Sequence, residues 1–208
     1  MKKFINNWFN ISVFFSGIAA VCAILIPLTE VQRLLLLSVS ILFLHFFEEF
    51  GFPGGFPYMG IKVLMKSKEM DPTNWDCNNL SSMFGNWVFL AAVYLLPVFL
   101  HNIRFMVLAV FLFNFAELFM HLILFNVALK TWYNSGLITA TTGLAPISFY
   151  FFFVVFHASD YIWYDYMCAF FYFAFFFWFC FRSPLYWKLG KKPGYEFTEQ
   201  SAFGPFKN

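Results

Sequence analysis

Polar residues, most of them ionisable, occur at helical spacing inside two strongly apolar stretches of the chain. These residues, in chain order, are His45, Glu48 and Glu49 in the first stretch and Asn114, Glu117 and His121 in the second. Because residues three or four positions apart share one face of an α-helix, each group should project from a single face. Charged side chains inside an apolar membrane helix are costly, and where they occur they usually serve a function. The two groups therefore predict a buried site built from imidazoles and carboxylates.

The residue types in this site are those that bind transition metals. Imidazole nitrogen and carboxylate oxygen together suit zinc, iron or manganese. We expect a divalent transition metal, with zinc favoured, and the candidate ligands are His45, Glu48, Glu49, Glu117 and His121. His45, Glu48 and His121 are enough for a catalytic zinc, and Glu49 or Glu117 would then act as general base toward water. All five residues as ligands would indicate an oxidative di-iron centre, although the Glu-x-x-His order of di-iron bundles is absent.

The same residues allow two functions other than catalysis. A transporter would use them as a proton or cation site, but the sequence shows neither an internal repeat nor paired broken helices. A scaffold protein would use them only to pair helices, since buried polar groups must be satisfied. We prefer the metal interpretation, and the expected activity is that of a hydrolase-type enzyme on a lipid or another hydrophobic small molecule dissolved in the membrane.

The composition indicates that the site lies in a membrane protein. Of the 208 residues, 61% are hydrophobic, 12% are charged and 35 are phenylalanine. A membrane helix needs about 20 apolar residues. Runs of about that length cover residues 8–28, 31–50, 84–100, 103–126, 137–156 and 161–181. Because these runs are continuously apolar, we predict an all-α, polytopic transmembrane helical bundle of about six helices, in a single domain over residues 1–208, and not a barrel.

The first run also has the outline of a secretory signal peptide, because Lys2 and Lys3 precede it and small residues occur near Ala23. The run continues past Ala23 to the length of a span, so we retain it as a helix. Eleven of the 13 Lys and Arg residues then lie on the side of the N-terminus, and only Arg33 and Arg104 lie on the other side. By the positive-inside rule, both termini and a basic tail over residues 182–208 should be cytoplasmic, in a bacterial inner or cell membrane. Membrane lipids are the expected partners, and nucleic acid is not.

This orientation places the two polar groups at one depth. The spans 31–50 and 103–126 run in the same direction, and His45 and His121 each lie five residues before the end of their span. At a rise of about 1.5 Å per residue, both histidines lie about 7 to 8 Å from the cytoplasmic boundary. We therefore expect the two groups to face each other near the cytoplasmic face.

Several blocks of sequence follow one another around these residues. They are His45-Phe46-Phe47-Glu48-Glu49, Phe52-Pro53-Gly54-Gly55-Phe56, Glu117 with His121, Tyr133-Asn134-Ser135-Gly136-Leu137-Ile138-Thr139-Ala140, and Pro146. In this order they resemble the HXXEE-motif family of multi-pass membrane proteins, over about residues 31–150. Ser135 stands where the family pattern has proline, and Glu117 stands where asparagine is common, which makes this site more anionic. The resemblance implies a membrane protein of uncharacterised function that is suspected of binding metal.

Other polar residues of these blocks could support the ligands. Hydrogen bonds to the ligands are expected from Asn114, Tyr133, Asn134 and Thr139, although turn and cap chemistry would also explain such residues.

Two segments after the first motif have two interpretations each. Residues 51–57, rich in glycine and proline, could cover the site as a lid or simply end the helix. Residues 61–68 alternate apolar and basic side chains, and they could lie on the anionic membrane surface or form a solvated loop.

Overall fold

The computed structural model describes residues 1–207, in which all regular secondary structure is helical and no strand occurs. Within that range, six helices are long and apolar enough to cross a membrane. They cover Trp8–Leu25, Glu30–Phe50, Asn79–Phe99, Arg104–Leu129, Leu137–Val155 and Trp163–Gly190. The predicted all-α membrane bundle of six spans is confirmed, and the ends of the spans differ from the predicted ones by up to nine residues.

Two of these spans are uninterrupted helices, and four are divided into successive segments. The first two are α2 (Trp8–Leu25) and α3 (Glu30–Phe50). The divided spans consist of α5 (Asn79–Phe89), η3 (Leu90–Leu95) and α6 (Leu96–Phe99); α7 (Arg104–Phe119), η4 (Met120–Phe125) and α8 (Asn126–Leu129); α9 (Leu137–Thr139), η5 (Ala140–Leu144), α10 (Ala145–Tyr150) and η6 (Phe151–Val155); and α11 (Trp163–Arg182) and α12 (Pro184–Gly190). The segments η3, η4, η5 and η6 are π-helical turns, which often occur at functional sites.

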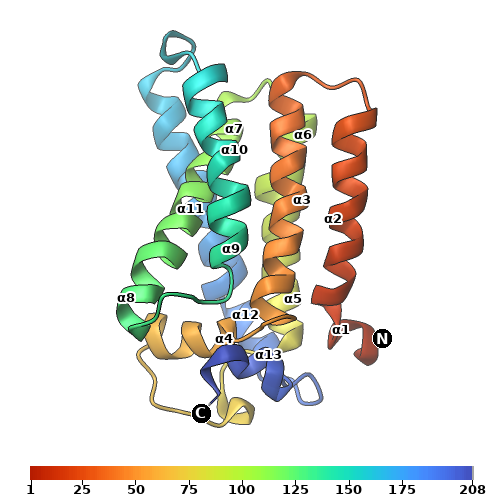
Figure 1. Cartoon of the computed structure of the whole chain (residues 1–208), viewed down its shortest axis with the longest axis vertical. Helices are drawn as coiled ribbons and strands as arrows, with labels where there is room; N and C mark the ends of the chain where they lie inside the picture. The colour runs from red at the N-terminus through yellow and green to blue at the C-terminus, as the bar shows by residue number, and fades with distance from the viewer. Residues whose placement is uncertain (208) are drawn as a thin grey trace.

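Both chain termini lie at one end of the bundle, the lower end in Figure 1, which we call the terminal end. The short elements at this end are α1 (Lys2–Ile5), α4 (Phe56–Met59), η1 (Gly60–Leu64), η2 (Pro72–Asn74), α13 (Glu199–Phe203) and η8 (Gly204–Phe206). The turn η7 (Ala158–Asp160) lies at the opposite end. The terminal end is therefore the more elaborately covered end of the bundle.

The helix α3 lies in the middle of the bundle and contacts α2, α6, α10 and the π-helical turns η3 and η5. It begins where the Thr29 side chain accepts a hydrogen bond from the Gln32 N–H, and it ends at Gly51. Along its length Leu35, Val39 and Leu42 are buried. Its final turns, which carry the first polar group, are thus enclosed on several sides by other helices.

Large apolar side chains cover the outside of the bundle. Phe14, Val127, Phe153 and Trp163 are 68%, 72%, 83% and 75% exposed. Exposed apolar surface of this extent is not tolerated on a protein in water, whereas lipid tails match it well.

The predicted basic tail is folded onto the terminal end as far as residue 207. Ser183 and Pro184 interrupt the last span, because the Ser183 side chain caps α12 and proline favours the first helical position. Farther on, α13 packs against α4, and the Gly55 N–H donates to the Ser201 carbonyl at 2.9 Å. Gly55 has φ +100°, and a Cβ atom there would lie 2.5 Å from a backbone carbonyl of α13. Residues 51–57 therefore end α3 and are held against the C-terminal segment.

The arrangement of the ends leads to a prediction about topology. We expect reporter fusions near Lys66 and at the C-terminal end to report one side of the membrane, the cytoplasm, because the basic residues gather at the terminal end. A fusion near Asp160 should report the opposite side. Paired phosphatase and fluorescent-protein fusions measure this, and opposite signals from the first two sites would contradict the arrangement of the spans.

Candidate functional site

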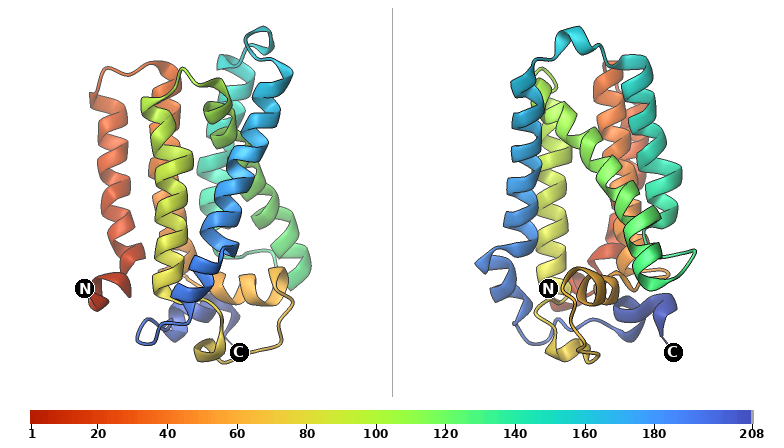
Figure 2. Two further views of the ribbon diagram at one scale, coloured as in Figure 1. Left: turned by 180° about the vertical axis from the view of Figure 1, so that it is seen from behind. Right: turned by 90° about the vertical axis from the view of Figure 1, so that its left-hand side faces the viewer.

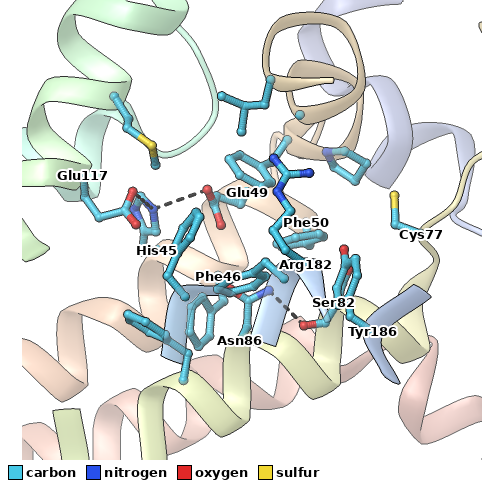
Figure 3. Close-up of a pocket in the computed structure, with 18 of the residues that line it drawn as sticks. His45, Phe46, Glu49, Phe50, Cys77, Ser82, Asn86, Glu117, Arg182 and Tyr186 are labelled. Atoms are coloured by element: carbon cyan, nitrogen blue, oxygen red, sulfur yellow. Dashed lines mark hydrogen bonds and ion pairs between the residues drawn. The ribbon is translucent and has the colours of Figure 1, made fainter. Parts of the chain in front are cut away.

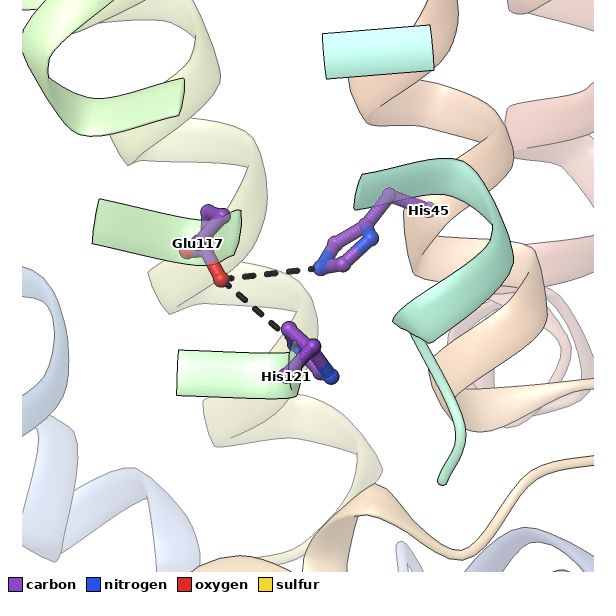
Figure 4. A group of neighbouring side chains, drawn as sticks. All are labelled: His45, Glu117 and His121. Carbon is purple, nitrogen blue, oxygen red and sulfur yellow. Dashed lines mark ion pairs between the residues drawn. The ribbon is translucent and has the colours of Figure 1, made fainter. Parts of the chain in front are cut away.

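Four buried side chains meet between α3 and the fourth span, toward the terminal end. His45 and Glu49 come from α3, whereas Glu117 comes from α7 and His121 from η4. His45 Nε2 lies 3.4 Å from Glu49 Oε1 and 3.7 Å from Glu117 Oε2. His121 Nε2 lies 3.5 Å from each of these two oxygens. We call these four residues the His/Glu cluster. Figure 4 shows Glu117 facing both imidazoles, and these three residues can bring one ligand atom each within 4.8 Å of the others.

The two histidines meet although their spans end at different distances from them. α3 ends at Phe50, as predicted, but the fourth span continues to Leu129, three residues beyond the predicted end. The imidazole centroids are nevertheless 4.9 Å apart, and His45 and His121 are only 2% and 0% exposed. The two histidines therefore lie side by side, as the sequence suggested. They are not equally far from the ends of their spans, contrary to what the sequence had indicated.

A chain of hydrogen bonds orients the His121 ring. Asn126 Nδ2 donates to the Leu122 carbonyl at 3.2 Å, so Asn126 Oδ1 accepts from Asn134 Nδ2, at 2.7 Å. Asn134 Nδ2 also donates to the His121 carbonyl at 2.7 Å, which turns Asn134 Oδ1 toward His121 Nδ1, again at 2.7 Å. An amide oxygen only accepts, so Nδ1 must carry the hydrogen. Nε2 then faces the two carboxylates, to which it presents a lone pair in the neutral imidazole and an N–H in the imidazolium. This atom has no hydrogen-bond partner within residues 1–207.

Thr139 orients the His45 ring in the same way. Thr139 Oγ1 donates to Glu48 Oε2 at 2.6 Å, and the same oxygen lies 2.7 Å from His45 Nδ1. Because the hydroxyl hydrogen is used by Glu48, the hydroxyl oxygen accepts from His45 Nδ1–H. His45 Nε2 therefore also faces the carboxylates of the cluster.

Glu48 lies outside the cluster, contrary to its expected place among the ligands. Its Oε1 accepts from the Tyr133 hydroxyl at 3.2 Å and the Ile138 N–H at 3.0 Å, and its Oε2 accepts from the Thr139 N–H at 2.9 Å. The carboxylate thus sits at the N-terminus of the span that begins at Leu137, where backbone N–H groups lack helical partners. Burial and the neighbouring Glu48 charge raise the pKa of the Tyr133 hydroxyl, which stays protonated and donates. Glu48 therefore anchors the loop that supplies Thr139.

The other residues expected to support the ligands divide in two. Asn134 and Thr139 contact the histidine rings directly. Asn114, by contrast, accepts from the Tyr94 hydroxyl at 2.7 Å and donates to Ser38 Oγ at 3.3 Å. This buried bridge ties three helices together and does not reach the cluster.

Gly136 packs directly against the cluster, a role that sequence reasoning missed. Its φ is +107°, and a Cβ atom there would lie 2.3 Å from His121 Cε1 and 2.8 Å from His121 Nε2. The adjoining Ser135 hydroxyl donates to the Gly54 carbonyl, which links the two glycine-containing loops. A glycine next to a predicted helix start was the available signal, since left-handed backbone favours glycine.

Comparison with protein families finds a match over the part of the chain that holds the site. Residues 34–151 match the family described as protein of unknown function with HXXEE motif. This range includes the whole His/Glu cluster together with the loop that orients both histidines. Comparisons with curated proteins and with solved structures gave no match.

The contact between Gly136 and the imidazole gives a stability prediction. Gly136→Ala should destabilise the protein by about 1–3 kcal/mol, because the methyl group meets the ring and the left-handed backbone disfavours alanine. The melting temperature in detergent should fall by several degrees. Gly17→Ala is the matched control, since Gly17 lies within α2 with nothing within 4 Å of its added Cβ. Equal melting temperatures for the two variants would contradict the packing of Gly136 against the ring.

Proposed function

The chain belongs to the family of proteins of unknown function with an HXXEE motif, and we propose that it is a metal-dependent membrane enzyme of hydrolase type. In this proposal His45, Glu117 and His121 bind the metal, and Glu49 is the general base. The substrate is a lipid or another hydrophobic molecule dissolved in the membrane. One observation carries the proposal: the Nε2 atoms of two imidazoles and two carboxylates face one another, and His121 Nε2 has no hydrogen-bond partner within residues 1–207.

The separations within the cluster favour a metal ion over shared protons. A hydrogen bond between imidazolium and carboxylate measures about 2.7–2.9 Å. The four N–O separations are instead 3.4, 3.5, 3.5 and 3.7 Å. Two ligands that bind one zinc ion at a tetrahedral angle lie about 3.3–3.6 Å apart, given bond lengths of about 2.0–2.2 Å. The two separations between proposed ligands, from Glu117 Oε2 to His121 Nε2 and to His45 Nε2, are 3.5 and 3.7 Å, which is close to the second arrangement and far from the first.

The surroundings of the histidines support the same proposal. Both Nδ1–H groups donate to oxygen atoms, of Thr139 and Asn134. Metal-binding histidines usually have such a partner, which fixes the ring and makes the other nitrogen a better ligand. The donor set suits zinc, and iron or manganese accept the same nitrogen and oxygen atoms.

The cluster is suited to hydrolysis because one of its carboxylates, that of Glu49, is not a proposed metal ligand and can transfer protons. A divalent ion bound there would supply Lewis acidity toward water and toward a carbonyl or phosphoryl oxygen. Glu49 lines a cavity beside the cluster and is 4% exposed. Its Oε1 is placed to accept a proton from the attacking water and to return that proton to the leaving group.

The other functions that the sequence allowed have less support. An oxidative di-iron centre needs Glu48 as a fifth ligand, but both oxygens of Glu48 accept hydrogen bonds from the loop that ends at Thr139. A proton-coupled transporter or a helix-pairing scaffold would need protons in place of the metal ion, and elemental analysis separates these two from the enzyme. A cation transporter would bind metal as well, and the absence of hydrolytic activity would distinguish it. The site lies toward the basic terminal end, so we propose that it faces the cytoplasmic side of the membrane.

Metal content tests the proposed ligands. We expect the purified protein to retain about one transition-metal ion per chain, and His45→Ala and His121→Ala each to lower this content at least tenfold. Elemental analysis by mass spectrometry after gel filtration in metal-free buffer gives the measurement. His157→Ala is the matched control, and Glu48→Gln should also keep the metal while lowering the melting temperature. Wild-type protein without metal would contradict the proposal and favour proton binding or helix pairing.

A variant of Glu49 tests its role as the base. Glu49→Gln is nearly isosteric, so we expect it to keep the fold and the metal while losing hydrolytic activity about 10²–10⁴-fold. Activity is measured on a panel of carboxylate and phosphate esters of long-chain alcohols. If Glu49 only neutralised the histidines, its loss would cost about 3–5 kcal/mol of stability. A strongly destabilised, metal-poor Glu49→Gln would therefore reassign Glu49 as a ligand or a structural partner.

A further inference from the structure

A cavity of about 110 Å³ opens beside the His/Glu cluster. Its walls come from α3, α5, α7, α11, α12 and the segment η1. Figure 2 shows α7 diverging from α11 toward the terminal end. Residues of both helices and of η1 line the cavity. Most of the wall is apolar, with Phe89, Phe113 and Phe177 among the lining residues, and Met120 and Phe177 are only half-buried. The cavity therefore joins the cluster to the outer surface of the bundle.

Arg182 is the one Lys or Arg residue within residues 1–207 that lines this cavity. It is the last residue of α11, and the break at Ser183 and Pro184 separates it from α12. Across the described part of the chain its guanidinium forms no ion pair with a carboxylate, and it lies 6.0 Å from the centroid of the Trp187 ring. Figure 3 shows its side chain among the lining residues, between Glu49 on one side and Cys77 on the other. A half-buried guanidinium without a counter-ion carries an uncompensated desolvation cost.

Apart from the residues of the His/Glu cluster, the polar side chains that line the cavity with Arg182 are uncharged. Ser82, Asn86 and Tyr186 line this part of the cavity and are 4%, 8% and 9% exposed. Burial, and then the neighbouring Asp76 charge, raises the pKa of the Cys77 thiol to about 12, so the thiol provides no counter-ion at neutral pH. Hydroxyl and amide groups beside one cation form a suitable environment for a small anionic group.

The negatively and positively charged residues lie in different parts of the cavity wall, so the two ends of a bound molecule would meet different surroundings. Glu49 and Glu117 lie at the cluster beside the two histidines, whereas Arg182 is the cation that attracts an anion from the other part of the wall. The aromatic side chains between these parts suit a hydrocarbon chain.

We propose that the cavity binds an amphiphile with a single carboxylate or phosphate head group at Arg182 and the adjoining part of its hydrocarbon chain along the aromatic wall beside the His/Glu cluster. A volume of about 110 Å³ holds only part of such a chain, so the remainder extends out of the cavity. This assignment rests on the proposed function only for the reaction that the bound amphiphile undergoes. The cavity and the Arg182 cation are present whether or not a metal ion is bound. It narrows the substrate class from hydrophobic molecules in general to acidic amphiphiles.

Binding of fluorescent amphiphiles tests the proposal. The probes are pyrene-labelled dodecanoic acid, the matching dodecyl phosphate and the matching dodecanol, added to the full-length protein in neutral detergent micelles. Energy transfer from tryptophan to pyrene reports binding, since Trp187 lines the cavity. We expect at least one acidic probe to bind about tenfold more tightly than the alcohol, and Arg182→Gln to remove this preference, because hydrogen bonds to charged groups contribute that much.

Two controls separate head-group binding at Arg182 from a general attraction of anions to the protein. Lys188→Gln removes an exposed cation from α12 that does not line the cavity, and it should preserve the preference. Inorganic phosphate and acetate at the probe concentration should not displace the acidic probes, and displacement would assign the site to a free anion and overturn the amphiphile. Even if Arg182→Gln does not fold, equal binding of acid, phosphate and alcohol by the wild-type protein overturns the proposal.

Metal analysis of the same samples distinguishes failure of the amphiphile site from failure of the proposed function. Metal-free protein that still prefers the acidic probes would contradict the proposed function alone. Metal-loaded protein that binds all three probes equally would contradict the assignment of Arg182 alone.

Discussion

The structure depends on the burial of two imidazoles and two carboxylates inside an apolar bundle, toward its terminal end. The two Nε2 atoms and the two carboxylates face one another at 3.4–3.7 Å, with the histidines 2% and 0% exposed. Such a group is unstable unless positive charge lies within it, as metal or as protons. Both Nδ1 atoms are committed to donating outward, so the fold itself prepares the inward face for a cation. The elements around α3 therefore hold these nitrogen and oxygen atoms in positions where they can bind a cation.

The two adjacent glutamates of the motif have different roles. One belongs to the cluster, and the other binds the segment that supports the cluster. Successive residues of an α-helix point about 100° apart, so Glu48 and Glu49 cannot face the same point. Glu49 faces the histidines, whereas Glu48 accepts hydrogen bonds from Ile138 and Thr139 at the start of the fifth span. Thr139 in turn orients His45. Glu49 thus belongs to the cluster, and Glu48 holds Thr139, which orients the His45 ring.

The sequence was sufficient for the features that depend on local patterns. Apolar runs predicted the six spans, and helical spacing brought His45, Glu49, Glu117 and His121 into one group, because the bilayer and the helix impose these regularities. It could not tell which of the adjacent glutamates faces inward, since that depends on where the loop before residue 137 packs. It also could not place Arg182 in the cavity. A basic residue at the end of a span looks the same whether it marks topology or binds a ligand.

The positions of the cluster, the cavity and Arg182 are consistent with one way of handling a substrate from the bilayer. An acidic amphiphile rests with its head group at the membrane boundary and its chain in the hydrocarbon. Arg182 lies where the last span reaches the terminal end, and Glu49 and Glu117 lie farther along the same cavity wall. A head group held at Arg182 would leave the chain, and not the charge, beside the carboxylates. The bond presented to the cluster would then be one at a distance from the acidic group, which points to hydrolysis of a linkage within the chain.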